Sequence, residues 1–271
     1  MQCLQQFLSL VNMIQKDFAD KVVEIVKQDT NVIGLAVAGS WITDELDEYS
    51  DLDLILITKN KIAGDKDKML GYARSFGDFI SGFTGEHVGE TRVLICLYDN
   101  PLLHVDIKFL TLPEFYDRVE NPVVLFERDK QLTAILTATK SEWPQPDLQW
   151  IEDRMWTWVH YIATKVARGE YFECLDGLGY IRAKVLAPLL QLKSNTAIRG
   201  LRKVEKKLKL PDLEDLKITV AQYSKASILK ALDNSISVYR MLRRKLFTDK
   251  VQLQARAEKR SMEYLKKIKG G

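Results

Sequence analysis

Two short apolar runs, separated by an acidic stretch, constrain this chain most. Residues 32–38 are rich in β-branched side chains and are followed by the pair Gly39-Ser40. A second run, 51–58, opens on an Asp-Leu-Asp triplet. Apolar runs of this length with β-branched residues are typical of buried strands. The pattern therefore predicts two buried strands, with a glycine turn at the end of the first and carboxylates at the start of the second.

The Asp-Leu-Asp triplet indicates a site for a cation. Successive side chains of a strand point to opposite faces, so Asp51 and Asp53 share one face. Two neighbouring carboxylates at the edge of a buried strand repel each other and are costly to desolvate. A hard divalent cation such as Mg²⁺ removes that cost, because it prefers oxygen ligands. Taken alone, the triplet also fits a solvated acidic turn.

A third carboxylate lies on a later strand, 102–110. Its polar residues His104, Asp106 and Lys108 alternate with apolar ones and so share one face. Asp106 is a candidate cation ligand, and the Lys108 ammonium is a candidate phosphate contact. The alternative is an exposed strand face with a local Asp-Lys pair. Because two separate strands now present carboxylates from polar faces, we favour the metal site.

The Gly39-Ser40 pair is a candidate phosphate-binding turn. Glycine lets the backbone approach a ligand closely, and the N–H groups of such a turn can face a phosphate. A helical turn over 41–46 would direct its N-terminus to the same point. We therefore expect the turn to lie beside the carboxylates.

The remaining patterns indicate an α+β protein: a small mixed β-sheet flanked by helices over 1–142, then an all-α helical bundle over 143–271. The Pro-containing segment 141–147 is the expected linker. In the first part we expect helices over 5–28 and 61–83 and a helix start near 112–114. Between them we expect a glycine-marked loop over 82–89 and a strand over 92–98, joined by a turn to the strand 102–110. An edge strand is expected over 123–126. In the second part we expect helices over 151–167, 171–192, 199–209 and 225–247, with Pro188 late in the second and Pro211 ending the third.

Charge is unevenly spread along the chain. Residues 1–112 hold 10 Lys/Arg against 17 Asp/Glu, and the remainder holds 30 against 20. An acidic first part suits cations and a basic second part suits phosphates, although both also fit ordinary solvated surfaces. The segment 240–269 has 11 Lys/Arg against 3 Asp/Glu but few aromatic residues for stacking on bases. We expect a solvated helix there and no nucleic-acid partner.

Cysteine usage and hydropathy point to the cytoplasm. The three cysteines, Cys3, Cys96 and Cys174, are isolated and show no zinc-ligand spacing. A sparse, odd count favours a reducing compartment. The first residues lack the basic lead and cleavage site of a signal peptide, and no apolar run approaches the ~18 residues of a membrane span. We expect a cytoplasmic protein with no membrane segment.

Together these residues resemble the signature of the DNA polymerase beta-like nucleotidyltransferase superfamily. That signature is an apolar strand, Gly39-Ser40, about ten residues, Asp51-Leu52-Asp53 on the next strand, and an acidic residue on a later strand, here Asp106. The order of domains, a small nucleotidyltransferase domain followed by a helical domain, is similar to that of the antibiotic branch of this superfamily. That branch acts on aminoglycosides and lincosamides. The specific match covers about 32–110, and the helical part matches in general character.

The resemblance implies a role for each matched residue. Asp51 and Asp53 would hold one or two Mg²⁺ ions that bridge a triphosphate, and Asp106 would be the third ligand or would orient the acceptor hydroxyl. Gly39 and Ser40 would contact the β- and γ-phosphates. The implied activity moves a nucleoside monophosphate from ATP or another NTP to a hydroxyl of a small-molecule acceptor, such as an antibiotic. The acceptor and the oligomeric state stay open.

Two further questions stay open at this point. A separate general base has four candidates, Glu86, His87, His104 and Glu114, each of which also has a plain structural explanation. An alternative function is a nucleotide-binding, antitoxin-like module with a helical partner domain. Arg154 followed by His160 resembles the Arg and His of helical ribonucleases, although both also fit an ordinary helix surface.

Overall fold

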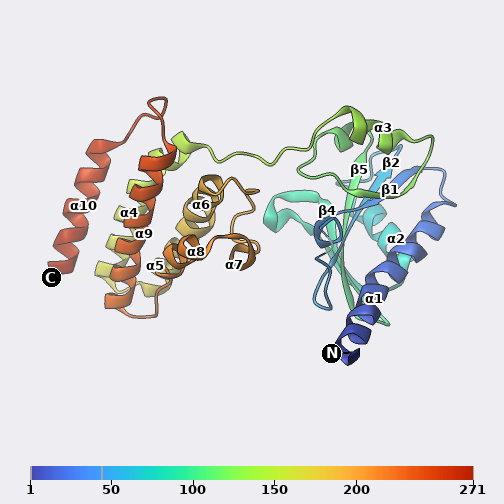
Figure 1. Cartoon of the computed structure of the whole chain (residues 1–271), viewed down its shortest axis with the longest axis horizontal. Helices are drawn as coiled ribbons and strands as arrows, with labels where there is room; N and C mark the ends of the chain where they lie inside the picture. The colour runs from blue at the N-terminus through green and yellow to red at the C-terminus, as the bar shows by residue number, and fades with distance from the viewer. Residues whose placement is uncertain (1, 44, 271) are drawn as a thin grey trace. The chain divides into compact units, whose positions relative to one another are not determined.

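The chain divides into two compact units, Met1–Glu142 and Trp143–Gly271 (Figure 1). The structure is a computed structural model that describes residues 2–43 and 45–270, with side chains described from residue 14 onward. Asp44, within the expected helical turn over 41–46, lies outside the described residues. Before it, a 3₁₀ turn spans Gly39–Trp41 and so begins earlier than expected.

A six-stranded mixed sheet forms the centre of the first unit, in the order β3-β4-β5-β2-β1-β6. β2 and β5 pair in parallel, and every other neighbouring pair is antiparallel. The strands are β1 (Val32–Val37), β2 (Leu52–Thr58), β3 (Asp78–Gly85), β4 (Glu90–Asp99), β5 (Leu103–Thr111) and β6 (Val123–Glu127). The expected mixed sheet flanked by helices is confirmed.

Helices cover the two faces of this sheet unequally. α1 (Gln2–Val26) and α2 (Lys66–Phe76) pack on the face formed by the apolar positions of β2 and β5, including Leu54 and Ile107. On the opposite face, α3 (Gln131–Ala138) and Phe115, from the 3₁₀ turn Pro113–Tyr116, cover Ile57 and Leu110. That second face also carries Asp53 and Asp106, toward the start of the same two strands.

The helix expected over 61–83 is wrong at its start, because α2 begins only at Lys66, and in its second half. α2 ends at Phe76, and the following residues form β3, which pairs with β4 from Asp78 opposite Asp99 onward. The apolar spacing continues by coincidence into β3, where Phe79 packs edge-to-face on Tyr98 of β4. The expected glycine loop over 82–89 is correspondingly shorter, because Gly82 and Gly85 belong to the strand. Cross-strand pairing here outweighs helical periodicity.

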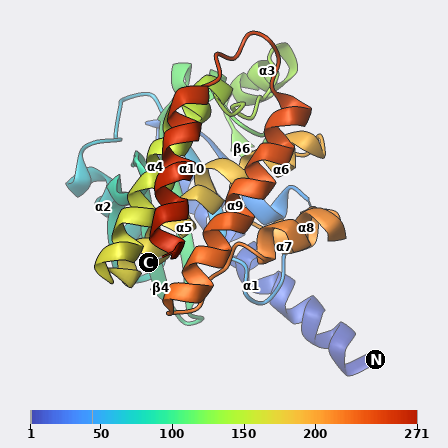
Figure 2. The same ribbon diagram turned by 90° about the vertical axis from the view of Figure 1, so that its left-hand side faces the viewer.

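The second unit is entirely helical (Figure 2). Its helices are α4 (Leu148–Arg168), α5 (Tyr171–Ile181), α6 (Ala187–Lys193), α7 (Val204–Lys207), α8 (Leu210–Lys217), α9 (Lys225–Leu246) and α10 (Ala255–Gly270). A π-helical segment, Arg182–Leu186, joins α5 to α6, and Pro188 stands in the first turn of α6, where its missing N–H is tolerated. Pro211 likewise lies in the first turn of α8, so it begins a helix where we expected only an ending.

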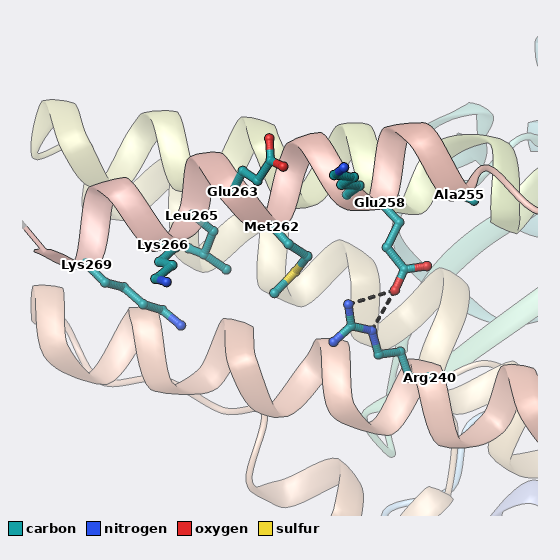
Figure 3. A pocket seen from close by; sticks show the side chains of 9 residues that line it. Arg240, Ala255, Glu258, Met262, Glu263, Leu265, Lys266 and Lys269 are labelled. Carbon is teal, nitrogen blue, oxygen red and sulfur yellow. Dashed lines mark hydrogen bonds and ion pairs between the residues drawn. The ribbon is translucent and has the colours of Figure 1, made fainter.

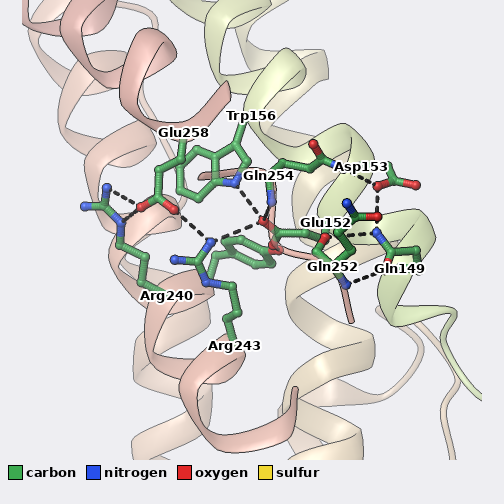
Figure 4. Close-up of polar contacts among 10 residues, drawn as sticks. Gln149, Glu152, Asp153, Trp156, Arg240, Arg243, Gln252, Gln254 and Glu258 are labelled. Carbon is green, nitrogen blue, oxygen red and sulfur yellow. Dashed lines mark hydrogen bonds and ion pairs between the residues drawn. The ribbon is translucent and has the colours of Figure 1, made fainter. Parts of the chain in front are cut away.

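A buried carboxylate ties α10 to the rest of this unit. Glu152 of α4 is fully buried and accepts hydrogen bonds from Trp156 Nε1 (3.2 Å) and from the backbone N–H of Gln254 (2.9 Å), as Figure 4 shows. It also accepts a hydrogen bond from the Tyr239 hydroxyl. Arg243 bridges Glu152 (3.3 Å) to Glu258 of α10 (2.8 Å). Within the basic segment 240–269, α10 is therefore a helix with one side packed on the unit, where we expected a solvated helix.

Among the helices that the described residues form, none combines the length and the apolar character that crossing a bilayer requires.

Candidate metal and nucleotide site

Three carboxylates converge on the face of the sheet opposite the one that α1 and α2 cover. Asp51 directly precedes β2, Asp53 lies in β2, and Asp106 lies in β5 as the register partner of Asp53. One oxygen from each lies within 4.8 Å of the other two, and all three side chains are half-buried. Oxygens that share one Mg²⁺ stand at most about 4.2 Å apart, so small side-chain rotations complete a site. The all-oxygen donor set fits a hard cation.

Gly39 packs directly against this cluster. Its φ is +66°, and a Cβ there would lie 1.9 Å from Asp53 Oδ2, so a side chain is excluded by both conformation and space. The neighbouring Ala38 N–H donates to the Asp53 carbonyl oxygen over 2.9 Å. Ser40, the next residue, is largely buried. The Gly-Ser turn thus lies beside the carboxylates, where the sequence led us to expect it.

A residue that the sequence did not indicate, Glu120, contacts this turn. The Gly39 N–H donates to Glu120 Oε1 over 3.1 Å. Glu120 lies in the irregular segment before β6, 81 residues along the chain, and no motif there marks it. The Glu120 carboxylate therefore accepts the hydrogen bond of the N–H group that we expected to face a phosphate. A phosphate oxygen can make that contact only if the carboxylate moves away.

Lys108 lies on the same face as Asp106, as the alternation predicted, but it is already paired. Its Nζ is 3.0 Å from Glu90 Oε2, and Arg92 contacts the same carboxylate at 2.6 Å. The hydrogen bonds from Arg92, and then those from Lys108, lower the pKa of Glu90 to about 2 despite partial burial. Two basic side chains therefore share the Glu90 carboxylate, and the sequence indicated only Lys108.

Of the four candidate bases, His104 contacts a carboxylate of the cluster. Its Nε2 is 2.9 Å from Asp106 Oδ1, and its ring is half exposed. Glu114 instead accepts hydrogen bonds from the backbone and hydroxyl of Thr111. The other two side chains pack locally, Glu86 against the Thr84 hydroxyl and His87 against the Phe83 ring.

In the helical unit, Arg154 and His160 do not form a site. Both lie in α4, six residues apart, which places them on different sides of the helix. The Arg154 guanidinium covers the Trp150 ring at 4.5 Å, and the His160 ring packs on Tyr264 at 4.6 Å. The ribonuclease-like pairing gains no support from this arrangement.

The helical unit also has a hollow of about 710 Å³ between α9 and α10 (Figure 3). The Arg240–Glu258 ion pair, 2.7 Å long, spans one end of it, and Met262 and Leu265 line its apolar part. Of its remaining charged lining residues, Lys269 pairs with Asp233 of α9 at 2.5 Å. Among the described residues, the lining contains no cluster of metal-binding groups. We assign it no role in chemistry.

Comparison with known proteins gives likenesses in structure alone. No family model and no curated protein sequence matches the chain. Similar solved structures include an aminoglycoside 6-adenyltransferase from Bacillus subtilis, with 15% identity, a TM-score of 0.43, and coverage of 95% of this chain and 99% of that one. A nucleotidyltransferase-like protein from Exiguobacterium sibiricum 255-15 has 13% identity, a TM-score of 0.33, and coverage of 85% and 73%.

A third similar structure is the spectinomycin adenyltransferase of Enterococcus faecialis with ATP and spectinomycin. It has 11% identity and a TM-score of 0.30, and the match covers 94% of this chain and 99% of that one. These names are of the kind that the sequence resemblance led us to expect. At such identities and TM-scores, the function of this chain has to be argued from its own site.

Proposed function

We propose that this chain is a Mg²⁺-dependent nucleotidyltransferase of the adenylyltransferase kind. It would move a nucleoside monophosphate from an NTP, ATP in the first place, to a hydroxyl of a small-molecule acceptor. The observation that carries the proposal is the convergence of Asp51, Asp53 and Asp106 beside the Gly39 turn. Nucleotidyl transfer needs metal-binding carboxylates and a phosphate-binding turn in one place, and these residues supply both.

The residues take distinct roles in this proposal. Asp51 and Asp53 hold the metal, with Asp106 as the third ligand or as the group that orients the acceptor hydroxyl. When bound, Mg²⁺ neutralises phosphate charge and aligns the attacking and leaving oxygens. Gly39 and Ser40 contact the β- and γ-phosphates, once Glu120 has released the Gly39 N–H. Lys108, two residues from Asp106 on the same face, balances the remaining phosphate charge once its Nζ has left the Glu90 carboxylate.

The reaction balances with these groups alone. The acceptor oxygen forms a bond to the α-phosphorus, and the bond from that phosphorus to the oxygen that bridges it to the β-phosphate breaks. Pyrophosphate leaves with the electron pair of that bond. The acceptor proton passes to a carboxylate oxygen of Asp106, which lies within 2.9 Å of His104 Nε2. No further co-reactant is needed.

We propose that the two units correspond to two domains with different roles. Met1–Glu142 contains every residue of the candidate site and is proposed as the nucleotidyltransferase domain. Trp143–Gly271 is proposed as the C-terminal helical domain. We further propose a cytoplasmic location, where ATP and Mg²⁺ are abundant.

Transfer of label from ATP tests the proposal. The protein is incubated with Mg²⁺ and ATP labelled at the α-phosphate, against hydroxyl-bearing antibiotics, metabolites and proteins, and labelled adducts and pyrophosphate are measured. We expect an adduct with at least one acceptor and its loss in Asp53→Asn. Asp65→Asn is the matched control, because Asp65 caps α2 away from the site and asparagine also caps helices. Undiminished transfer by Asp53→Asn would overturn the assignment.

A further inference from the structure

A second pocket of about 710 Å³ lies in the first unit and shares a wall with the carboxylate cluster. It is bordered by Ile14 and Gln15 of α1, by the loop 48–51 and by the adjoining ends of β4 and β5. Asp51 and His104 belong to its lining. Because the Asp51 carboxylate is also part of the cluster, a molecule in this pocket lies next to the proposed metal.

Gln15 supplies an unsatisfied hydrogen-bond acceptor in this pocket. The residue is only 3% exposed, and its Nε2 donates to the carbonyl oxygens of Asp47 (3.3 Å) and Ser50 (3.0 Å). Its Oε1 is buried and has no hydrogen-bond partner among the described residues. Leaving a buried carbonyl oxygen without a donor is costly, and native proteins rarely do so. A bound N–H or O–H group would satisfy it once a movement of the Gln15 side chain opens Oε1 to the pocket.

The remaining walls set the chemistry of such a molecule. Leu97, Leu102 and Leu103 give the pocket an apolar side, suited to the face of a ring. Glu48 and Asp51 add carboxylates, and no lysine or arginine occurs among the described residues that line it. An acidic pocket attracts hydrogen-bond donors and cations and repels anions.

We propose that this pocket binds the acceptor, and that the acceptor is a small ring molecule with an apolar face, an N–H or O–H donor directed to Gln15 Oε1, and no negative charge. This rests on the proposed function, because only the cluster makes the neighbouring molecule an acceptor. The pocket excludes a phosphorylated acceptor at this position. The hydroxyl that receives the nucleotide stands on the side of the pocket formed by Asp51 and His104.

Two isosteric probes test the pocket without any need for catalysis. One is trans-4-aminocyclohexanol, which is cationic, and the other is trans-4-hydroxycyclohexanecarboxylate, which is anionic. Each is titrated into the ¹⁵N-labelled full chain without metal or nucleotide, and the Gln15 side-chain NH₂ and the Leu103 and His104 backbone amides are followed by NMR. We expect saturable shifts with the amine up to about 10 mM, the weak range of single fragments, and none with the carboxylate.

Variants then localise the binding. Leu102 is 69% exposed, so Leu102→Lys adds a cation to the wall without disturbing the core, and we expect it to weaken binding of the amine about fivefold. Leu210→Lys is the matched control at the same 69% exposure in α8, and it should leave binding unchanged. Gln15→Met removes Oε1 and should also weaken binding, while Leu102→Lys carries the test if that variant does not fold.

Each outcome decides the matter. Equal binding of the two probes, no shift at Gln15 with the amine, or unchanged binding in Leu102→Lys would overturn the acceptor pocket. None of these results depends on transfer activity. The proposed nucleotidyltransferase would then stand or fall separately on the Asp53→Asn assay.

Discussion

Asp53 and Asp106 lie directly opposite each other on the parallel strands β2 and β5. Both therefore leave the sheet on the same face, the one that α1 and α2 do not cover. A slip of one residue in this pairing would turn one carboxylate into the apolar core, so the register that buries Leu54 and Ile107 also assembles the site. The core and the cluster are specified by one pattern of alternation.

Gly39→Ala should damage the site as well as the fold. The new Cβ would meet Asp53 Oδ2 and would also have to adopt a φ of +66°. We expect a loss of about 1–3 kcal/mol in unfolding free energy, from strain, and at least about tenfold weaker Mn²⁺ binding, from displacement of Asp53. Urea denaturation and metal titration measure the two effects.

Gly64→Ala is the control for that substitution. Gly64 also has a positive φ, +90°, but nothing stands within 4 Å of the place that a Cβ would take, so it shares the conformational cost without the clash. It should lose stability and keep metal binding. Equal metal binding by the Gly39 and Gly64 variants would contradict the account.

Glu120→Gln should tighten nucleotide binding. The substitution removes a negative charge from the Gly39 N–H, where a phosphate is proposed to bind. Like charges about 4 Å apart repel by about 1 kcal/mol even in bulk water, so we expect at least about fivefold lower Kd for Mg·ATP by calorimetry. Glu142→Gln makes the same charge change at an exposed position and should leave Kd unaltered. A raised Kd in Glu120→Gln would instead make Glu120 a positive contributor to binding.

The Glu90 ion pairs should make stability depend on pH in the acid range. Arg92, and then Lys108, lower the pKa of this carboxyl from 4.5 to about 2, so the folded state binds fewer protons than the unfolded state between these values. The stabilisation is complete above pH 4.5 and is lost as the pH falls toward 2. Glu90→Gln should cost about 1–2 kcal/mol at pH 7.

Chemical denaturation at several pH values measures this effect. The gap in unfolding free energy between wild type and Glu90→Gln should be constant from pH 7 to about 5 and should close between pH 4.5 and 2. A gap that keeps its full pH 7 size at pH 2.5 would show that Glu90 stabilises the fold by packing and not by charge.

Glu152→Ala should destabilise the helical unit strongly. The substitution leaves Arg243, Trp156 Nε1 and the Gln254 N–H without their shared acceptor in a buried site. Removing one partner of a buried ion pair costs about 3–5 kcal/mol. Glu263→Ala, which breaks an exposed ion pair with Arg260 on α10, should cost less than about 1 kcal/mol. Tryptophan fluorescence during urea unfolding compares them, and equal losses would contradict the anchoring role of Glu152.

Local patterns predicted much of the sheet and of the carboxylate cluster. Alternation along 102–110 correctly placed Asp106 and Lys108 on one face and Val105 and Ile107 on the other, because a strand with one buried face leaves a period of two in its sequence. The position of the Gly-Ser turn beside Asp53 could also be predicted, because a glycine in the sequence marks a place where the backbone approaches a neighbouring group closely. Its close backbone approach tolerates only glycine.

Other features depend on contacts between distant segments, which leave no local signal. The sequence of β3 predicts the end of a helix, because its apolar residues keep helical spacing. Its pairing with β4 makes it a strand in spite of that spacing. Glu120 reaches Gly39 from 81 residues away. The unsatisfied oxygen of Gln15 becomes visible only once α1 lies against the loop that contains Ser50. Burial of Glu152 likewise follows from the packing of α10 on α4.

Metal binding by the three carboxylates is the central claim, and Mn²⁺ titration followed by electron paramagnetic resonance tests it most directly. Wild type, Asp53→Asn, Asp106→Asn and the control Asp65→Asn are compared with and without ATP. We predict one or two bound ions in wild type and in Asp65→Asn, with affinity at least about tenfold weaker in Asp53→Asn and in Asp106→Asn. Mn²⁺ affinity equal in all four proteins would contradict the account.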